Sequence, residues 1–352
     1  MKIKNIFPFL IIAALIIGLS NQCLAQSRRG TTTANFLEIS LGTGAAMGDA
    51  NVAITNDLMS IYWNPAGLGY MDKSEAKFSN QPYILNTGVQ FAGVGIVVPR
   101  VATLALGVTH IGFGETEVTT LTYPEGTGEK YTANDYAVSL SAGRRLTEWF
   151  AFGATAKYVS SQIWHISASG TALDLGVIVN TGFFSSIGRN KDGMNIGMSI
   201  SNYGSGLSYD GIDLYQAIDI DPKATGNYAG TSGKFHTRTW EFPLIFRIGF
   251  SIKRFVTPKQ NLVIAVDALH PNNNNESVNI GGQYNFALPG YGDIYVCGGY
   301  KGIGDPKSIF GFTYGAGVFL SMGPSFAAKI DVGYKTIGDL GNVLMYEFSV
   351  LF

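Results

Sequence analysis

Residues 308–322 read SIFGFTYGAGVFLSM, and their side chains separate into two sets at alternate positions. The apolar set consists of Phe310, Phe312, Tyr314, Ala316, Val318 and Leu320. The opposite set consists of Gly311, Thr313, Gly315, Gly317, Phe319 and Ser321. Successive side chains of a β-strand point to opposite faces, so this period of two predicts a strand with one apolar face. The same alternation covers 278–286 and 326–335 and runs through most of the chain from about residue 73.

The composition decides where the apolar faces point. A soluble sandwich also alternates, but only 14% of this chain is charged, against about 25% in soluble domains, and 45 of its 352 residues are glycine. The polar face carries Gly, Thr and Asn where a soluble sheet would carry many Lys and Glu. The alternating runs are about 10 to 14 residues long, against 5–6 in soluble proteins. We therefore predict an all-β transmembrane antiparallel barrel whose apolar face contacts outer-membrane lipid.

The last strand supports this interpretation. Tyr346, Phe348, Val350 and Phe352 stand at alternate positions up to the end of the sequence. A terminal aromatic strand of this kind resembles the signal read by the barrel insertion machinery of outer membranes. We expect that machinery to be a partner of the chain.

Counting the alternating runs gives about fourteen strands. Their centres lie near residues 78, 93, 106, 139, 154, 175, 198, 246, 264, 281, 296, 314, 330 and 347. The runs near 78 and 198 are weakly marked, so twelve or sixteen strands remain open. Barrels of this type have short periplasmic turns and longer external loops. We place 113–132, 203–237 and 270–276 outside and the turns near 99, 147 and 322 inside, with 181–193 an unusually long inner connection.

The amino terminus predicts export. Lys2 and Lys4 precede an apolar run over residues 6–19, and Ala25 completes a small-residue cleavage site. The run has about 14 residues, fewer than the ~20 that a membrane-spanning helix needs. Residues 1–25 therefore form a predicted secretory signal peptide, and the expected location is the cell outer membrane. Removal of the signal leaves Cys297 as the single cysteine, so no disulfide within the chain is expected.

Residues 26–70 differ from the alternating region at 71–352 and are predicted to form a hatch. Two motifs mark them: GTGAAMGDA at 42–50 and IYWNPAGL at 61–68. The candidate functional residues of the hatch are Gly44, Met47, Gly48, Asp49, Trp63, Asn64, Pro65, Ala66 and Gly67. Their small side chains permit close packing inside a lumen, because a fourteen-stranded barrel is too wide for its own side chains to fill. Two placements stay open: a plug in the lumen, or a strap beneath the barrel.

These motifs resemble the amino-terminal pattern of FadL-like outer-membrane barrels and, more closely, of the PorV/PorQ family. TALDLG at 171–176, SNYG at 201–204 and HPNNNNE at 270–276 continue the resemblance. It implies a fourteen-stranded barrel with a hatch that acts in type IX protein secretion, as a component that binds clients or the translocon. The alternatives are a FadL-like channel for small hydrophobic molecules such as long-chain fatty acids, and a structural barrel that scaffolds a surface complex.

Charged side chains on the polar face form the remaining candidate set. Alternation directs Lys157, Asp174, Arg247, Asp267, Lys329, Asp331, Lys335 and Glu347 into the lumen. Their signs are mixed across neighbouring strands. This favours ion pairs that rigidify a plugged interior over a ladder of one sign that guides a substrate.

We expect no enzymatic activity and no cofactor. The glycines at 42, 44 and 48 miss the nucleotide-binding spacing G-x-G-x-x-G by one position. The four histidines show no metal-ligand spacing, and the aspartates at 210, 213, 219 and 221 lack the EF-hand pattern, so no metal site is predicted. The net charge of −1 shows no excess of basic residues, so we expect no binding to nucleic acid.

Overall fold

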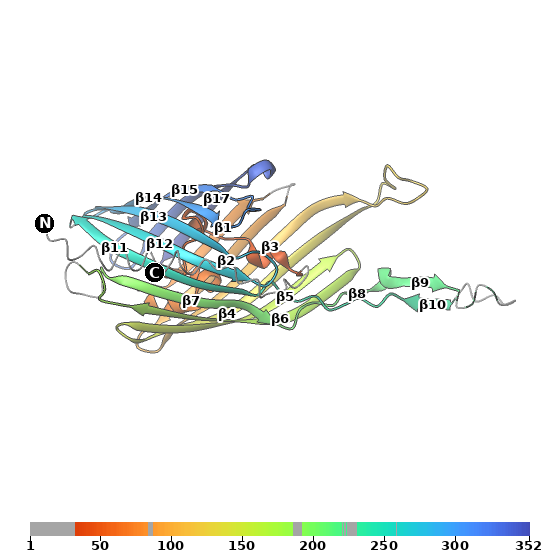
Figure 1. The fold of residues 1–352 in the computed structure, drawn as a ribbon, viewed down its shortest axis with the longest axis horizontal. Coiled ribbons are helices and arrows are strands. Elements are labelled where there is room, and N and C mark those ends of the chain that lie inside the picture. Colours follow the sequence, from red (N-terminus) through yellow and green to blue (C-terminus); the bar gives the residue numbers. More distant parts are fainter. Residues whose placement is uncertain are drawn as a thin grey trace. The chain divides into compact units, whose positions relative to one another are not determined.

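The computed structural model describes residues 32–83, 87–185, 192–219, 221, 223, 231–257 and 259–352. The predicted signal peptide lies outside the described residues. Fourteen long strands form the barrel wall (Figure 1): β1 Glu75–Pro82, β2 Gly88–Val98, β3 Ala102–Glu117, β4 Lys130–Thr147, β5 Phe150–Ile163, β6 Ile166–Asn180, β7 Met194–Gly204, β11 Ile245–Thr257, β12 Gln260–Pro271, β13 Ser277–Leu288, β14 Gly292–Ile303, β15 Phe312–Ser321, β16 Ala327–Thr336 and β17 Asn342–Leu351. Each predicted strand centre falls inside one of them, so the strand count is confirmed.

The wall is a closed antiparallel meander. Each strand pairs with its neighbour in the chain, β7 pairs with β11, and β1 pairs with β17 through register partners such as Phe78 and Phe348. The short strand β8 Asp210–Gly211 adds to β6 outside the ring, and β9 Tyr215–Ile218 and β10 Thr231–Lys234 form a separate hairpin. Closure leaves no strand edge in the hydrocarbon region, where unpaired backbone groups are not tolerated.

The predicted alternation is confirmed in the wall. On β15, Tyr314 is 49% exposed on the outer face, whereas the neighbouring Thr313 is 2% exposed and faces the lumen. One residue differs from the sequence interpretation. The alternation predicts Phe310 on the outer face, but β15 begins at Phe312, and Phe310 is half-buried beneath the Lys301 ammonium, which lies 3.9 Å from the centre of its ring. The period of two holds only where the backbone is paired in the sheet, and residues 304–311 connect two strands.

The connections divide the barrel into two ends. We name as the long-loop end the one that carries connections 118–129, 205–244, 272–276 and 304–311. The short-turn end carries 99–101, 148–149 and 322–326, together with the longer connection 181–193. By the usual asymmetry of such barrels, we expect the long-loop end to be external and the short-turn end to be periplasmic.

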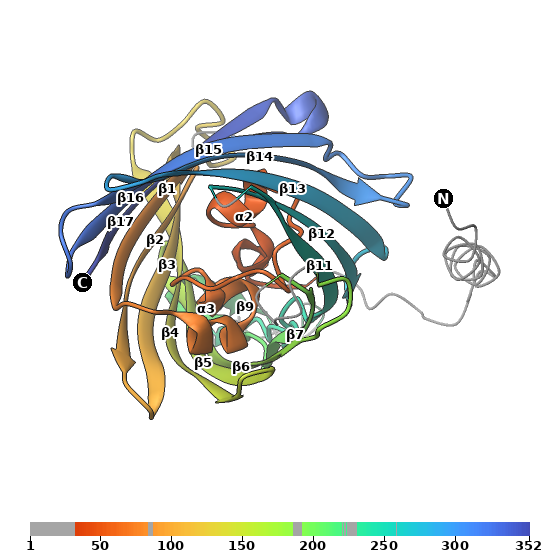
Figure 2. The same ribbon diagram turned by 90° about the vertical axis from the view of Figure 1, so that its left-hand side faces the viewer.

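The hatch lies inside the ring of strands, where Figure 2 shows α2 and α3 enclosed by the wall. Its elements are η2 Asn35–Glu38, α2 Thr43–Ala46, α3 Ser60–Trp63 and η3 Pro65–Tyr70. Most of its apolar side chains are buried, including Leu41, Met47, Leu58 and Leu68. Within the described part of the chain, none of the helices has the length and apolar character required to cross a bilayer.

Candidate functional site

Glycines of the wall let the hatch backbone approach the strands. A Cβ atom added at Gly281 on β13 would lie 2.2 Å from the carbonyl oxygen of Met47, and one at Gly153 on β5 would lie 2.2 Å from Pro65. Such a Cβ would also come within 2.0 to 2.6 Å of hatch atoms at Gly143, Gly176, Gly197 and Gly299. The high glycine content of the lumenal face is therefore explained by contact with the hatch.

Gly48 meets the wall from the other side. Its φ of 67° lies in the left-handed region, and a Cβ there would lie 2.6 Å from the carbonyl oxygen of Ile280. Its N–H donates to the hydroxyl of Thr313 at 2.8 Å, and that hydroxyl donates to the carbonyl oxygen of Ala46 at 2.9 Å. Glycine is thus required at position 48 by both the backbone conformation and the available space.

Buried carboxylates of the wall accept hydrogen bonds from hatch N–H groups. Gly42 precedes α2 and has no side chain to cap it, and Glu347 on β17 accepts from the N–H of Thr43 at 3.0 Å. Asp267 on β12 accepts from two successive N–H groups, those of Asn51 at 2.7 Å and Val52 at 2.9 Å. A short segment that cannot satisfy its own first N–H groups is thereby anchored to the wall.

Glu75 on β1 extends this pattern, since it accepts from the N–H of Leu58 at 2.9 Å. These wall carboxylates meet the hatch at well-separated places along its sequence. These hydrogen bonds therefore fix the path of the hatch as well as its position.

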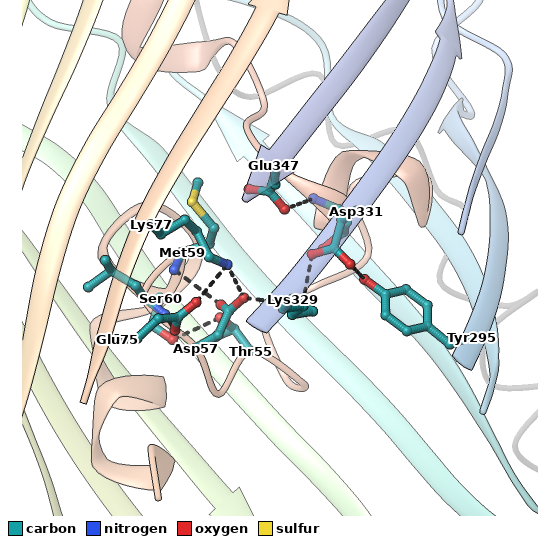
Figure 3. A network of polar contacts seen from close by, with 12 residues as sticks. Thr55, Asp57, Met59, Ser60, Glu75, Lys77, Tyr295, Lys329, Asp331 and Glu347 are labelled. Carbon is teal, nitrogen blue, oxygen red and sulfur yellow. Dashed lines mark hydrogen bonds and ion pairs between the residues drawn. The ribbon is translucent and has the colours of Figure 1, made fainter. Parts of the chain in front are cut away.

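An ion network joins the hatch to strands β1 and β16 (Figure 3). Asp57 of the hatch accepts from the Lys77 ammonium at 2.5 Å and lies 3.8 Å from Lys329, which in turn lies 3.1 Å from Asp331. The Tyr295 hydroxyl donates to Asp331. Burial alone would raise the pKa of Asp57, but the ammonium groups of Lys77 and Lys329 hold it below its ordinary value. Asp57 is therefore an anion that pins the hatch to the wall.

Lys157 and Asp174 form a pair within the wall. Their charged groups are 2.6 Å apart, Lys157 also donates to the side chain of Asn202, and Asp174 accepts from the Asn202 N–H at 2.7 Å. Asn202 has a φ of 65°, near the register shift between β6 and β7. This pair therefore supports an irregular position within the wall.

Asn64 links the hatch to the wall near the short-turn end. Its amide nitrogen donates to the carbonyl oxygens of Val52 at 2.9 Å and Val177 at 3.1 Å, and its amide oxygen accepts from the Ala66 N–H. The backbone of Asn64 is extended, as expected before proline. However, the Asn64-Pro65 step joins α3 to η3, and β1 begins later, at Glu75. The step is therefore internal to the hatch, and the six residues of η3 separate it from the first strand.

The other predicted hatch residues are packed in the lumen. Met47, Trp63 and Ala66 are buried, and Asp49 lies 2.5 Å from the Lys301 ammonium on β14. A Cβ on Gly44 would meet Trp63 at 2.7 Å, and one on Gly67 would meet Ser60 at 2.5 Å. These two glycines therefore serve contacts within the hatch.

A cavity of about 840 Å³ opens above the hatch at the long-loop end. We call it the vestibule. Its charged lining includes Glu38 and Asp49 of the hatch and Arg247, Lys301 and Lys335 of the wall, and rings of Phe36, Tyr62, Tyr83 and Phe310 supply apolar surface. Burial raises the pKa of the Glu38 carboxyl, although a hydrogen bond from Asn273 opposes the shift.

Sequence reasoning missed five charged residues of this interior: Glu38, Asp57, Glu75, Lys77 and Lys301. The alternation of Glu75, Lys77, Ser79 and Gln81 on β1 could have revealed two of them. Lys301 has the same parity as the lumenal Tyr295 and Cys297 on β14. No such signal pointed to the hatch acids Glu38 and Asp57, because apolar and polar residues do not alternate in the hatch sequence.

The aspartates of the longest connection do not converge. Asp210 lies 2.5 Å from Lys234, and Asp213 lies 3.1 Å from His165, so each pairs with a different partner. Across the described residues, no group of three or more His, Cys, Asp or Glu side chains is placed to hold a metal ion.

Comparison with solved structures shows that the fold is that of FadL-type barrels. The CymD monoaromatic hydrocarbon channel has a TM-score of 0.55 at 11% identity, with 89% of this chain and 97% of that chain covered. The Pseudomonas putida toluene transporter TodX has a TM-score of 0.55 at 9% identity, covering 88% and 96%. A Pseudomonas aeruginosa FadL homologue has a TM-score of 0.51 at 10% identity, covering 88% and 96%. At these identities the likeness establishes the fold alone.

The family follows from the sequence. Residues 22–221 match the family model described as type IX secretion system protein PorV, and the chain belongs to that family. The resemblance to PorV/PorQ is thereby confirmed. A comparison with curated proteins gives no match.

Proposed function

We propose that this protein serves type IX secretion as a plugged outer-membrane barrel that binds client proteins or the translocon at its long-loop end. We further propose that it does so without enzymatic activity or a cofactor. The match to the PorV family model over residues 22–221 carries the proposal. The resemblance to the PorV/PorQ family implies clients that bear a carboxy-terminal sorting domain.

The filled lumen supports a binding role rather than a conduit. The hatch is held by wall carboxylates, by the Asp57 network and by backbone contact with wall glycines. A client protein would have to break all of these contacts to pass through the barrel. Binding at the external end requires no such rearrangement.

Exposed apolar side chains at the long-loop end offer a surface for that binding. Tyr215 and Ile218 on β9, and Phe235 directly after β10, are exposed in the connection between β7 and β11. These residues lie outside the lipid-facing wall, so contact with lipid tails does not account for them. Exposed apolar groups of this kind mark protein interaction sites.

The test is affinity isolation from detergent-solubilised membranes of cells that carry the secretion machinery. Full-length protein should co-purify with translocon components or clients with a sorting domain. The triple variant Tyr215→Ser, Ile218→Ser, Phe235→Ser should co-purify with at least about tenfold less of these proteins than the wild type does. Leu121→Ser with Tyr123→Ser, two exposed residues of the 118–129 connection, serves as the matched control. Bound fatty acid with no secretion component would contradict the proposal.

The vestibule favours a second candidate function, passage of small hydrophobic molecules. Its volume of about 840 Å³ falls in the range of ligand pockets. Uptake of a labelled hydrocarbon by vesicles containing the barrel, at rates above those of empty vesicles, would support this alternative. Passage would require the hatch to move, since the hatch is enclosed by the wall (Figure 2) and packs on Gly153 and Gly176 near the short-turn end.

A further inference from the structure

Three arginines lie at the short-turn end of neighbouring strands. Arg100 stands in the turn between β2 and β3, and Arg144 and Arg145 lie near the end of β4, which pairs with β3. Arg144 donates to the carbonyl oxygen of Arg100 at 3.5 Å, so the end of β4 contacts the turn. Arg145 lies against the hatch, with its guanidinium 5.7 Å from the ring centre of Tyr70. We call the two exposed arginines, Arg100 and Arg144, the rim pair.

Arg144 lies on the lipid-facing side of β4. Its register partner on β5 is the exposed Phe152, whereas the register partner of Arg145 is the buried Ala151. Leu140, four residues before Arg144 on the same face, is also exposed. A charged side chain on the lipid-facing surface of a barrel is costly at the bilayer midplane and is tolerated near the membrane interfaces. Arg144 therefore stands at the edge of the apolar band.

Exposed apolar side chains continue past Arg144 towards the short-turn end. Leu146 follows it on β4, Trp149 lies in the next turn, and Val101 lies beside Arg100. Tryptophan is enriched in membrane barrels and helices at the level of the lipid head groups. The rim pair is therefore placed at head-group depth, where the phosphate groups of the lipids lie.

Arg100 occupies a backbone conformation that arginine rarely adopts. Its φ is 66°, and the N–H of Val101 donates to the carbonyl oxygen of Val98 at 3.1 Å, which closes a turn with Pro99 at its second position. Glycine or asparagine is usual where the third position of such a turn has a positive φ. Strained residues of this kind gather at binding sites, so the strain at position 100 indicates that the arginine side chain has a use.

The rim pair has no acidic partner within the described residues. Asp72 and Glu148, the exposed acids of the adjoining segments, form no ion pair with either arginine in this part of the chain. A guanidinium matches a phosphate group in two parallel hydrogen bonds. We propose that the rim pair binds the phosphate of an anionic phospholipid, whose acyl chains lie along the apolar outer face of β3, β4 and β5.

The charge of the rim pair selects the kind of lipid. Basic pockets at a membrane surface recognise anionic head groups. A zwitterionic head group carries an ammonium group beside its phosphate, and two adjacent guanidinium groups repel that ammonium. The site lies at the opposite end of the wall from the vestibule, and the proposal does not depend on a role in secretion.

The test is native mass spectrometry of full-length protein in detergent, titrated with phosphatidylglycerol or with phosphatidylcholine of the same acyl chains. The two lipids share the phosphate and the chains, but only phosphatidylglycerol has a net negative charge. We expect the first phosphatidylglycerol to bind at least about tenfold more tightly than the first phosphatidylcholine. Glycerol 3-phosphate should not displace the bound lipid, because it lacks the chains that contact the wall.

Two variants remove the charges of the rim pair. Arg144→Gln should weaken binding of phosphatidylglycerol about tenfold and reduce the preference for it over phosphatidylcholine. Arg100→Gly should also weaken this binding, and should leave the melting temperature unchanged or raise it, because glycine adopts a φ of 66° without strain. Arg254→Gln, which removes an exposed arginine near the end of β11, is the matched control and should bind phosphatidylglycerol as the wild type does.

Several outcomes would overturn the proposal. Equal affinity for the two lipids, or no binding of either, would show that the rim pair does not select an anionic head group. Unchanged phosphatidylglycerol affinity in both rim variants would place the lipid elsewhere, and an equal loss in Arg254→Gln would reduce the effect to general charge attraction. Displacement by glycerol 3-phosphate would assign the site to a free phosphate. Heat-modifiable gel mobility establishes that each variant is folded.

Discussion

Gly281 and Gly282 are adjacent on β13 but have opposite surroundings, which makes them a matched pair. A Cβ at Gly281 would lie 2.2 Å from the carbonyl oxygen of Met47 in the hatch, whereas one at Gly282 would lie 3.7 Å from the nearest atom, the carbonyl oxygen of Val263. Gly281→Ala should therefore displace the hatch, and Gly282→Ala should not.

The free energy lost in Gly281→Ala depends on which atoms must move to make room for the new methyl group. The atom that obstructs the new methyl group at position 281 belongs to the backbone, so no side-chain rotation relieves the clash. Overpacking of this kind costs about 1–3 kcal/mol. If the hatch shifts instead, the hydrogen bond from the Gly48 N–H to Thr313 is lost, and an unsatisfied buried donor also costs about 1–3 kcal/mol. Gly282→Ala should be neutral or slightly stabilising, because alanine has less freedom in the unfolded chain.

Hydrogen exchange of residues 42–53, measured in lipid nanodiscs, separates the two variants. A loss of about 1–3 kcal/mol corresponds to exchange about fivefold to 150-fold faster in Gly281→Ala, with wild-type rates in Gly282→Ala. The wall strands should stay protected in both variants. Equal protection of residues 42–53 in the two variants would refute close packing of the hatch on β13.

Three further predictions concern the wall and the ion network. Val332→Arg on the lipid-facing side of β16 should lower the free energy of unfolding in vesicles by ~2–4 kcal/mol. If the free energy falls no further in Val332→Arg than in Val332→Thr, this face does not contact lipid. Asp57→Asn should destabilise the barrel at pH 7 by about 1–3 kcal/mol, because the buried Lys77 loses its partner at 2.5 Å. The pKa of Asp57 lies below its ordinary value, so the contribution of Asp57 is present above about pH 4 and is lost as the pH falls through the lowered pKa. The urea unfolding curves of the two proteins should therefore converge in acid, and a difference that widens as the pH falls would contradict the ion pair. Deletion of Phe352, whose N–H donates to the Ser74 carbonyl at 2.9 Å, should reduce the amount of heat-modifiable barrel in the outer membrane, and an undiminished amount would show that the terminal residue is dispensable.

The wall could be predicted from the sequence because lipid imposes a period of two on every strand. Even the weakly marked strands near 78 and 198 appear where expected, as β1 and β7. Orientation of the lumenal charges followed from the same parity. Phe310 departs from this period because it lies in a connection, where the backbone is not paired with a neighbouring strand.

The partners of the lumenal charges could not be predicted. Glu347 and Asp267 face backbone N–H groups of the hatch, and nothing in the spacing of residues 42–52 indicates which wall strand they meet. That path depends on contacts between segments more than 200 residues apart in sequence. The vestibule was likewise hidden, because it is formed jointly by the hatch and the outer ends of several strands.

Ion conductance in planar bilayers tests most directly whether the hatch plugs the lumen. Full-length protein should insert and remain closed, because residues 32–70 fill the ring of strands. Deletion of residues 34–62 removes Asp57, Asn51, Val52 and their wall contacts while leaving all fourteen strands. The truncated barrel should still insert and should now conduct ions. A truncated barrel that folds and stays as closed as the full-length protein would contradict this prediction.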